Sequence, residues 1–433
     1  MSEPFRVAVI GAGPAGAVTA MLLAARGASV TLFDDGRRPE LLVGESLVPA
    51  LVPMLKRLGV EEEIASFSRL KPGVSFIWSP TDRFSFTFSR FAPGVYPYTY
   101  NTPRPRFDEA LLARAVACGA HRVDFKARVE PARGTGTDAE IALTRETLDA
   151  APALGGRQPH LIVDASGRAR HVARVLGIRA HVGPRSDVAY FAHYEGFVWD
   201  EPPGQLLLSR AEAGWSWCIP LRERLSVGIV LGHADAARLG ASPEERIARA
   251  IGINPWLSKI LPDGKRVTGV ATYSNYQLIS ERGLGPGWVM VGDTFGHVDP
   301  MLSPGVFLAM KSAEMVADLL APVVEGRRAP TPAALAAVLA PYPPAQTAAL
   351  AAWRELIEYF YDGRVVAAIR AGREWQEQKG ESWLKTAMQK HISRHIALQA
   401  SGARTGARYS RGLLKFLCTH GLRGVDPAEL AIR

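Results

Sequence analysis

Apolar and polar positions alternate along the chain with a period that differs from one region to the next. An apolar run from Val7 to Ile10 is followed by a segment of small residues that ends at Gly27, and then by a second apolar run that ends at Asp34 and Asp35. Short apolar runs bounded by turn residues predict strands, and the longer segment between them predicts a helix. The N-terminal region is therefore predicted to form a strand, a helix and a second strand of an α/β unit.

The following segments continue this mixed pattern. Residues 70–88 alternate between apolar and polar positions, which predicts β structure, whereas the apolar residues of 104–119 recur at helical spacing. Residues 123–129 are predicted to return as a strand, and the apolar run at 161–164 predicts another.

From residue 187 the period changes to two. Four stretches within 187–232 have this period and are separated by glycine, proline and charged turns, which predicts a β-sheet layer inserted between parts of the first unit. Beyond it the pattern predicts, in order, a helix over 242–251 that begins at Ser242, strands around 267–279 and 288–291, and a helix over about 305–320.

The C-terminal region is predicted to be mostly helical. Prolines between positions 330 and 344 mark its beginning. Within it, Trp353, Ile357, Phe360 and Tyr361 fall on one side of a helix. We interpret this stripe as hydrophobic core.

The turn after the first strand has the spacing of a dinucleotide site. It reads Gly11-Ala12-Gly13-Pro14-Ala15-Gly16. In such a site the first glycine permits the sharp turn, the second lets the backbone approach a pyrophosphate, and the third lets the helix pack closely. An acidic residue at the end of the second strand binds ribose hydroxyls, and an ordinary glycine-rich turn does not explain it. Asp34 and Asp35 both meet this condition, and the motif alone leaves NAD and FAD open.

Composition and cysteine usage narrow the class of protein. Of the 433 residues, 47% are hydrophobic and 21% charged, as in an ordinary globular enzyme. Cys118, Cys218 and Cys418 lie far apart, which argues against a disulfide framework or a metal site and favours a reducing compartment. The apolar N-terminal segment is interrupted by glycines, a proline and Arg26, and no run reaches the length of a membrane span. We therefore expect a cytoplasmic protein without a transmembrane segment.

The net charge of +9 is concentrated near the C-terminus. Only Asp426 and Glu429 oppose the basic residues there, which are Lys385, Lys390, Arg394, Arg404, Arg408, Arg411, Lys415, Arg423 and Arg433. They form either a solvated helical face or a docking surface for an acidic protein, a carrier or a membrane head-group. Nucleic acid is not an expected partner, because no recognition motif accompanies the charge.

Three later motifs decide between the cofactors. Arg104-Pro105-Arg106-Phe107-Asp108, Asp164-Ala165-Ser166-Gly167 and Gly292-Asp293 follow one another in the order found in FAD-dependent monooxygenases. The sequence resembles that superfamily, and within it the flavin-dependent halogenases, over roughly its first three-quarters. The resemblance implies a glutathione-reductase-like, Rossmann-like FAD-binding domain.

The resemblance also implies a set of FAD contacts. The glycine turn would hold the pyrophosphate, Asp34 or Asp35 the ribose, Arg104 the phosphates and Asp293 the ribityl chain. The loop at residue 44 would lie beside the isoalloxazine ring, and the helix that starts at Gly305 would face its pyrimidine edge. The full set is Gly11, Gly13, Pro14, Ala15, Gly16, Asp34, Asp35, Gly44, Glu45, Ser46, Leu47, Arg104, Val129, Gly167, Asp293, Pro300, Gly305 and Val306.

Three features resemble the halogenases in particular. Residues 215–220 read Trp-Ser-Trp-Cys-Ile-Pro, which matches a WxWxIP motif, and residues 297–305 resemble the family's FxxPxxSxG loop. Lys71 falls where the family carries its catalytic lysine, which binds or carries the hypohalous oxidant. The alternative for Lys71 is an ordinary solvent-exposed lysine at a strand edge.

The sequence departs from the halogenase pattern in that loop. Halogenases bind halide with backbone N–H groups there, but Pro304 has no N–H to donate. A hydrogen bond to a charged group contributes roughly 1.5–3 kcal/mol, so its loss weakens halide binding by about ten- to a hundredfold. His297 also replaces the phenylalanine that starts the loop.

These observations together predict an FAD-dependent monooxygenase. The expected reaction is hydroxylation of a phenol- or indole-type ring through a flavin C4a-hydroperoxide, with O₂ as co-substrate. Electrons would come from NAD(P)H, directly or through a flavin reductase. Lys71 is the candidate catalytic residue, and the candidate substrate contacts are Trp215, Trp217, His193, Tyr190 and His297.

The predicted organisation has an FAD-binding domain over 1–335, interleaved with an antiparallel β-sheet substrate layer (about 65–103 and 180–280), and a helical region over 336–433. The close alternative is a flavin-dependent halogenase. More distant ones are a flavoprotein reductase of the geranylgeranyl type and a non-enzymatic flavin-binding scaffold. A further hypothesis is that the substrate is presented on an acidic protein, peptide or carrier, as in the flavoproteins of similar sequence that hydroxylate a peptidyl tryptophan in tryptophylquinone biogenesis.

Overall fold

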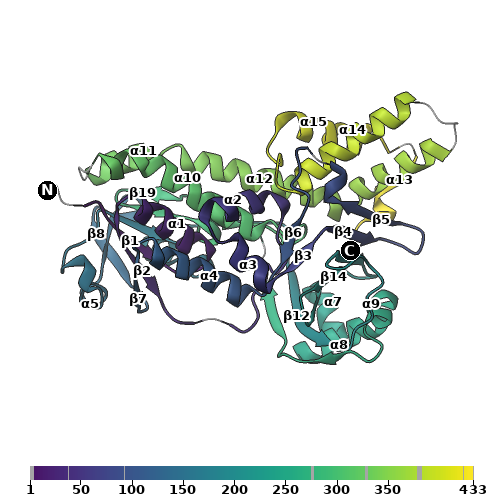
Figure 1. Cartoon of the computed structure of the whole chain (residues 1–433), viewed down its shortest axis with the longest axis horizontal. Coiled ribbons are helices and arrows are strands. Elements are labelled where there is room, and N and C mark those ends of the chain that lie inside the picture. Colours follow the sequence, from purple (N-terminus) through teal and green to yellow (C-terminus); the bar gives the residue numbers. More distant parts are fainter. Residues whose placement is uncertain are drawn as a thin grey trace.

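The computed structural model describes residues 4–37, 39–91, 93–274, 277–326, 330–377, 383–422 and 424–432, with the backbone alone at 375–377 and 384–385. Figure 1 shows an elongated molecule. The N-terminal α/β unit lies at one end, and the C-terminal helices and an antiparallel sheet lie at the other.

A six-stranded sheet forms the core of the first unit. Its strands lie in the order β19-β20-β10-β1-β2-β7, and only β19 is antiparallel to its neighbour. The strands span Leu284–Gly285 (β19), Trp288–Met290 (β20), Leu161–Asp164 (β10), Arg6–Ile10 (β1), Ser29–Asp34 (β2) and His121–Asp124 (β7). Helix α1 (Pro14–Ala25) packs between α4 (Arg104–Ala117) and α10 (Gly305–Glu325). The predicted Rossmann-like α/β fold is confirmed.

One predicted strand is wrong. The pattern at 123–129 suggested a single strand, but β7 ends at Asp124 and a separate strand, β8 (Val129–Arg133), pairs with β9 (Glu140–Leu143). Apolar and charged residues alternate without interruption through 123–129, but residues 125–128 lie outside any strand, so the alternation does not mark where β7 ends.

A second, mainly antiparallel sheet has eight strands in the order β16-β12-β15-β14-β13-β4-β5, with β17 paired to β12. Its strands span Lys265–Arg266 (β16), Asp187–Glu195 (β12), Leu225–Gly232 (β15), Trp215–Pro220 (β14), Leu206–Arg210 (β13), Gly73–Ile77 (β4), Arg83–Thr87 (β5) and Ala271–Ser274 (β17). One face joins the main core, and the other packs against α7 (His233–Leu239), α8 (Pro243–Ile253) and α9 (Pro255–Ile260). The predicted period of two in 187–232 is confirmed.

The remaining elements cover the two sheets and connect them. The small strands are β3 (Arg69–Lys71), β6 (Thr99–Asn101), β11 (Ala180–Val182), β18 (Leu278–Ser280) and β21 (Gly296–His297). The helices are α2 (Val52–Leu58), α3 (Glu61–Phe67), α5 (Arg145–Asp149), α6 (His171–Leu176), α11 (Pro332–Leu339), α12 (Tyr342–Tyr361), α13 (Arg364–Glu377), α14 (Trp383–Ala400) and α15 (Arg408–His420). Ser242 caps α8 as predicted, through a reciprocal capping box with Glu245. No described helix is long and apolar enough to cross a bilayer.

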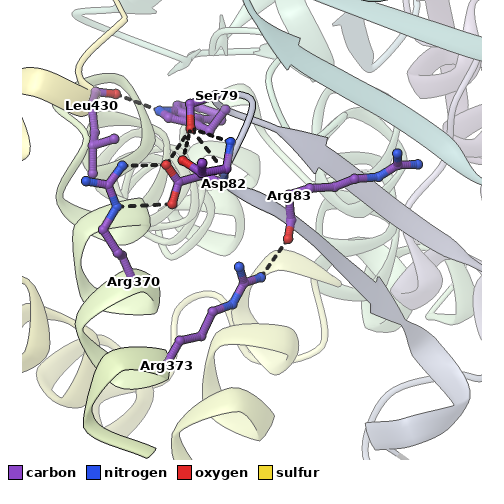
Figure 2. Close-up of polar contacts among 8 residues, drawn as sticks. Ser79, Asp82, Arg83, Arg370, Arg373 and Leu430 are labelled. Atoms are coloured by element: carbon purple, nitrogen blue, oxygen red, sulfur yellow. Dashed lines mark hydrogen bonds and ion pairs between the residues drawn. The ribbon is translucent and has the colours of Figure 1, made fainter. Parts of the chain in front are cut away.

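Helix α13 of the C-terminal region binds the β4–β5 hairpin through hydrogen bonds and an ion pair (Figure 2). Arg370 of α13 donates to both carboxylate oxygens of Asp82, and Arg373 donates to the carbonyl of Arg83 at 2.8 Å. Beneath these contacts the ring of Phe360 stacks on that of Phe76, with centroids 5.4 Å apart. The end of α12 is therefore held against the second sheet.

Candidate active site

A cavity of about 530 Å³, the first cavity, opens where the strands β1, β2, β10 and β20 end. The carboxyl ends of parallel strands are the usual place for a ligand in an α/β sheet. Most of the predicted cofactor residues line it: Gly11, Gly13, Pro14, Ala15, Asp34, Asp35, Gly44, Glu45, Ser46, Arg104, Gly167, Asp293, Pro300, Gly305 and Val306. Gly16, Leu47 and Val129 lie outside its lining.

The glycine turn has the shape that a pyrophosphate requires. Gly11 has φ +102°, and a Cβ there would lie 2.5 Å from the carbonyl oxygen of Ala165. A Cβ on Gly16 would meet the carbonyl oxygen of Gly11 at 1.8 Å, which explains why Gly16 is required without lining the cavity. A Cβ on Gly13 would meet no protein atom within 4 Å, so this backbone faces open space. No side chain caps the N-terminus of α1, whose first N–H groups are left for an anion.

The two candidate ribose ligands differ in environment. Asp34 is buried at the end of β2; its carboxylate accepts the N–H of Gly36 at 3.3 Å and pairs with Arg122 at 3.3 Å. Asp35 is exposed and accepts the N–H of Arg37. Both line the cavity. Asp34 is the better preorganised of the two, because its neighbours fix its carboxylate.

Arg104 provides a buried cation beside the cavity. Its guanidinium donates to both carboxylate oxygens of Asp108, at 3.1 and 3.2 Å, and to the carbonyl of Val43. Burial lowers the pKa of Arg104, but the Asp108 carboxylate outweighs this and holds the pKa above its ordinary value. A Cβ on Gly44 would lie 2.6 Å from this guanidinium, so the loop at residue 44 needs a glycine there. The site keeps a positive charge that suits the phosphates of a dinucleotide.

Glu45 and His193 form a buried pair that the sequence did not suggest. His193 Nε2 lies 2.7 Å from Glu45 Oε1, and both side chains are buried. Glu45 lines the first cavity, whereas His193 reaches it only through Glu45. The two residues are 148 positions apart, so no sequence spacing could have linked them.

The predicted substrate contacts divide between two faces of the second sheet. Trp215, Trp217 and His297 line the first cavity. Tyr190 lies on the opposite face, in the apolar cluster under α8, where its hydroxyl accepts from Arg246 at 2.6 Å. Alternate side chains of a strand point to opposite faces, and the neighbouring Phe191 is the one that lines the cavity.

Lys71, the last residue of β3, is buried beside a second, smaller cavity. Its side chain is 2% exposed, and its Nζ donates to the carbonyl oxygen of Leu47 at 3.0 Å. Burial lowers the pKa of Lys71 to about 7, and its Nζ lies 5.7 Å from the centre of the Phe88 ring. Lys71 is therefore not a solvent-exposed lysine at a strand edge.

The second cavity is almost entirely apolar and holds about 40 Å³. Its walls come from distant parts of the chain: Val48, Pro49, Lys71, Val74, Phe76, Phe86, Phe88, Leu206, Leu208, Leu302, Phe360, Ile396, Ala397, Ala400 and Ser401. Leu206 and Leu208 line both cavities. A thin partition therefore separates them.

The loop before α10 forms part of this partition. Leu302 faces the second cavity and Ser303 the first. Both have left-handed backbone, with φ of 67° and 60°, which disfavours any residue other than glycine. Pro304 then begins α10 as its N-cap with φ −79°.

Asp299 anchors this loop, and the sequence did not identify it. Its Oδ1 accepts the N–H of Met301 and its Oδ2 the hydroxyl of Tyr361, both at 2.9 Å. Burial raises the pKa of Asp299 to about 6. Tyr361 belongs to the stripe predicted as core, and the structure confirms its burial while adding this polar contact.

The described residues contain no cluster of three or more His, Cys, Asp or Glu side chains that fits a metal ion. The three cysteines are free.

Comparisons with known proteins identify the family of the chain. The family model described as FAD binding domain matches residues 5–332. The chain is 31% identical to a tryptophan 2-halogenase of Chondromyces crocatus over 74% of this chain and 62% of that protein. It is 27% identical to a 1H-pyrrole-2-carbonyl-[peptidyl-carrier protein] brominase of Pseudoalteromonas luteoviolacea over 77% and 81% of the two chains. The chain thus spans less than two-thirds of the tryptophan 2-halogenase.

Solved structures show the same fold. The flavin-dependent brominase Bmp2 superposes with a TM-score of 0.75 at 22% identity, covering 94% of this chain and 96% of that one. The myxobacterial chondrochloren halogenase CndH superposes with a TM-score of 0.71 at 24% identity, covering 96% and 97%.

Proposed function

The chain belongs to the FAD binding domain family, with the flavin-dependent halogenases and FAD-dependent aromatic monooxygenases, and from this premise we propose that it halogenates an aromatic ring. This differs from the hydroxylation that the sequence favoured. The observation that carries the proposal is the position of Lys71, buried in the wall of the second cavity, which a thin partition separates from the first. An oxidant that must pass from a cofactor cavity to a separate substrate cavity needs a polar group on its way.

The first cavity has the residues that FAD requires: the open backbone at Gly13, the uncapped start of α1, the carboxylate of Asp34 and the cation of Arg104. Reduced FAD would supply the electrons that convert O₂ and a halide ion into a hypohalous acid and water. The ring would then take the halogen from that acid, lose a proton from the same carbon, and release water.

Lys71 would hold the hypohalous acid beside the ring. Its Nζ has three donor positions when protonated, and Leu47 takes one of them. With a pKa of about 7, the amine could give a proton to the oxygen of the acid, which would leave as water, and then take up the proton that the ring carbon loses. The apolar side chains of Leu206, Leu208 and Leu302 would keep bulk water away from this oxidant.

A specific observation favours hydroxylation as a second candidate. Pro304 has no N–H at the position where relatives of this kind would bind a halide ion. Without halide, oxygen would be transferred directly to a ring in the first cavity, next to Trp215 and Trp217.

One experiment separates the two candidates. The holoenzyme is given reduced FAD, O₂, bromide and a panel of phenols and indoles, and the products are analysed by mass spectrometry. Halogenation predicts a bromine isotope doublet, whereas one or two added oxygens and no bromine would overturn it in favour of hydroxylation.

Pro304→Ser sharpens that test. If the enzyme halogenates, the restored N–H should lower the KM for bromide by about ten- to a hundredfold, since a hydrogen bond to a charged group contributes 1.5–3 kcal/mol. Pro304→Ala is the matched control: it restores the N–H without a hydroxyl and should give most of the same gain. A hydroxylase would show no bromide dependence in either variant.

We further propose that the flavin receives its electrons from NAD(P)H, directly or through a separate reductase. The chain has a single GxGxxG turn, which is the one at the first cavity. Under anaerobic conditions, direct reduction would bleach the absorbance of bound FAD when NADH or NADPH alone is added. Bleaching only after a flavin reductase is added would assign the second route.

The aromatic ring would be carried by an acidic carrier protein that docks on α14 and α15. Inner residues of α14 (Ile396, Ala397 and Ala400) line the second cavity. Its outer face and that of α15, side by side in Figure 1, expose Lys390, Arg394, Arg408 and Lys415 together with Tyr409 and Phe416. Two relatives act on a pyrrole bound to a peptidyl carrier protein, which supports this proposal. Of the basic residues predicted to form this surface, the side chain of Lys385, and Arg423 and Arg433, lie outside the described residues.

Charge reversal tests this surface. With an aromatic acyl group on an acidic carrier as substrate, Lys390→Glu combined with Arg408→Glu should raise KM and steepen the dependence on salt. Turnover of the free aromatic acid should not change. Arg145→Glu is the matched control, because Arg145 is exposed on α5 at the opposite end of the molecule. Equal turnover of free and carrier-bound rings by all variants would overturn the proposal.

A further inference from the structure

Three segments that are far apart in sequence meet at the hydroxyl of Tyr361. The indole N–H of Trp215 donates to this hydroxyl at 2.8 Å, and the hydroxyl donates to Asp299 Oδ2 at 2.9 Å. Trp215 comes from the second sheet, Asp299 from the loop before α10 and Tyr361 from the end of α12. All three side chains are buried. The hydroxyl thus accepts one hydrogen bond and donates another, and each partner depends on it.

We propose that Tyr361 is a positioning residue that holds the partition loop (Asp299–Pro304) and Trp215 in place. When a ring enters the second cavity and displaces its walls, Tyr361 passes this displacement on to the side chains of the first cavity. This rests on the proposed function only in assuming that an aromatic ring enters the second cavity.

The partition loop needs such an anchor because its backbone is strained. Leu302 and Ser303 both adopt the left-handed region, which is unfavourable for a residue with a Cβ. Strain of this kind persists only where surrounding contacts impose it. Within the loop, Met301 donates to Asp299 and Ser303 donates to the carbonyl of Pro300. From outside the loop, the Tyr361 hydroxyl holds the Asp299 side chain.

The charges around Asp299 favour the direction of this hydrogen bond. The guanidinium of Arg185 lies 3.8 Å from the centre of the Tyr361 ring and pairs with Asp187 at 2.6 Å. Asp187 opposes and Arg185 favours the ionised form of Asp299. Burial is the largest cause that raises the pKa of Asp299, to about 6. Because the indole N–H of Trp215 can only donate, the Tyr361 hydroxyl accepts from it and donates its own hydrogen bond to the Asp299 carboxylate.

The second cavity must widen to admit a ring, and its walls are the residues next to the anchor. It holds about 40 Å³, whereas a cavity of about 150 Å³ accepts benzene. Phe360 and Leu302 both line it. Phe360 precedes Tyr361 in α12, and Leu302 lies in the loop that Tyr361 holds. A ring that displaces either wall therefore moves Tyr361 relative to Asp299 or to Trp215, and Trp215 lines the first cavity.

Tyr361→Phe tests this inference in the FAD-loaded enzyme. The substitution removes one hydroxyl and keeps the ring under Arg185. Tyr359→Phe is the matched control, because the Tyr359 hydroxyl contacts only Glu355, within the same helix. The loss of a hydrogen bond should weaken FAD binding in Tyr361→Phe by about two- to tenfold, with no change in Tyr359→Phe.

The decisive measurement uses indole as a neutral aromatic probe and the fluorescence of bound FAD as the signal. Indole should change the flavin fluorescence of the wild type and of Tyr359→Phe. In Tyr361→Phe, indole should still bind, as equilibrium dialysis would show, but the flavin response should be lost. Ala397→Phe, which fills the second cavity, should abolish binding and locate the probe there.

A full flavin response in Tyr361→Phe would overturn the proposal, as would an absence of indole binding to the wild type. If Tyr361→Phe failed to retain FAD, Trp215→Phe would replace it as the test, because it removes the other hydrogen bond of the same hydroxyl. The assay contains no halide, so a failure of halogenation leaves its outcome unaffected.

Discussion

The two cavities differ in how far apart in the sequence their key residues lie, although Leu206 and Leu208 line both. The first lies at the ends of parallel strands, and its key atoms are backbone atoms of contiguous turns such as residues 11–16. The second is assembled from side chains drawn from positions 48 to 401, including two C-terminal helices. A nucleotide site of the first kind is set by backbone geometry, whereas a site of the second kind is set by how distant segments pack. The glycine turn of the first cavity is thus local in sequence, whereas the walls of the second cavity are not.

The largest effect should come from Lys71, which tests whether the second cavity is a reaction site. Lys71→Met keeps a long apolar side chain and removes the amine. A positioned proton donor contributes on the order of 10²–10⁴-fold, so kcat should fall by about that factor. FAD binding, measured by titration of flavin fluorescence, should stay at the wild-type value, because Lys71 does not line the first cavity. Near-normal turnover in Lys71→Met would remove its catalytic role.

The next effect concerns the first cavity, where two glycines should separate binding from folding. Gly13→Ala places a methyl group in open space, so the free energy of unfolding should hardly change, but FAD affinity should fall on the order of a hundredfold. Gly16→Ala forces a Cβ against the Gly11 carbonyl and should lower the stability of the apoprotein by about 1–3 kcal/mol or more. Urea unfolding and FAD titration of both variants measure the two quantities. Equal losses of stability would contradict this division.

The smallest effect is the pH dependence that Lys71 gives to stability. Its pKa is about 7 in the fold and about 10.5 in an unfolded chain, so between these values the unfolded chain binds more protons. Stability should therefore rise with pH across this window, by up to about 1.4 kcal/mol per pH unit. Lys71→Met should lack this contribution. The free energy of unfolding of the wild type should therefore rise relative to that of Lys71→Met by about 2–3 kcal/mol between pH 7 and 9. The free energy of unfolding of both proteins is measured by urea titration at each pH. If it changed equally with pH in the two proteins, the lowered pKa of Lys71 would be contradicted.

The sequence predicted the elements around the first cavity well. The strands at 7–10 and 161–164, the helices beginning at Arg104 and Gly305, and the cap at Ser242 all appear in the structure. These elements have local signals, such as an apolar period, a proline at the first turn or a capping box. The predicted strand at 123–129 was wrong because the alternation of apolar and charged residues does not show where a strand leaves its sheet. Tyr190 was placed with the substrate contacts because the pattern gives the alternation of a strand but not which face meets the cavity.

What the sequence determined by itself was the nucleotide-binding turn, because its requirements, glycine φ angles and close backbone approach, are met by six consecutive residues. What only the tertiary structure decided was the state of Lys71 and the roles of Glu45, Asp299 and Tyr361. Their properties come from desolvation and from hydrogen bonds between segments that are 62 to 148 positions apart. Burial of an amine depends on every segment that packs over it, and no local pattern contains that information.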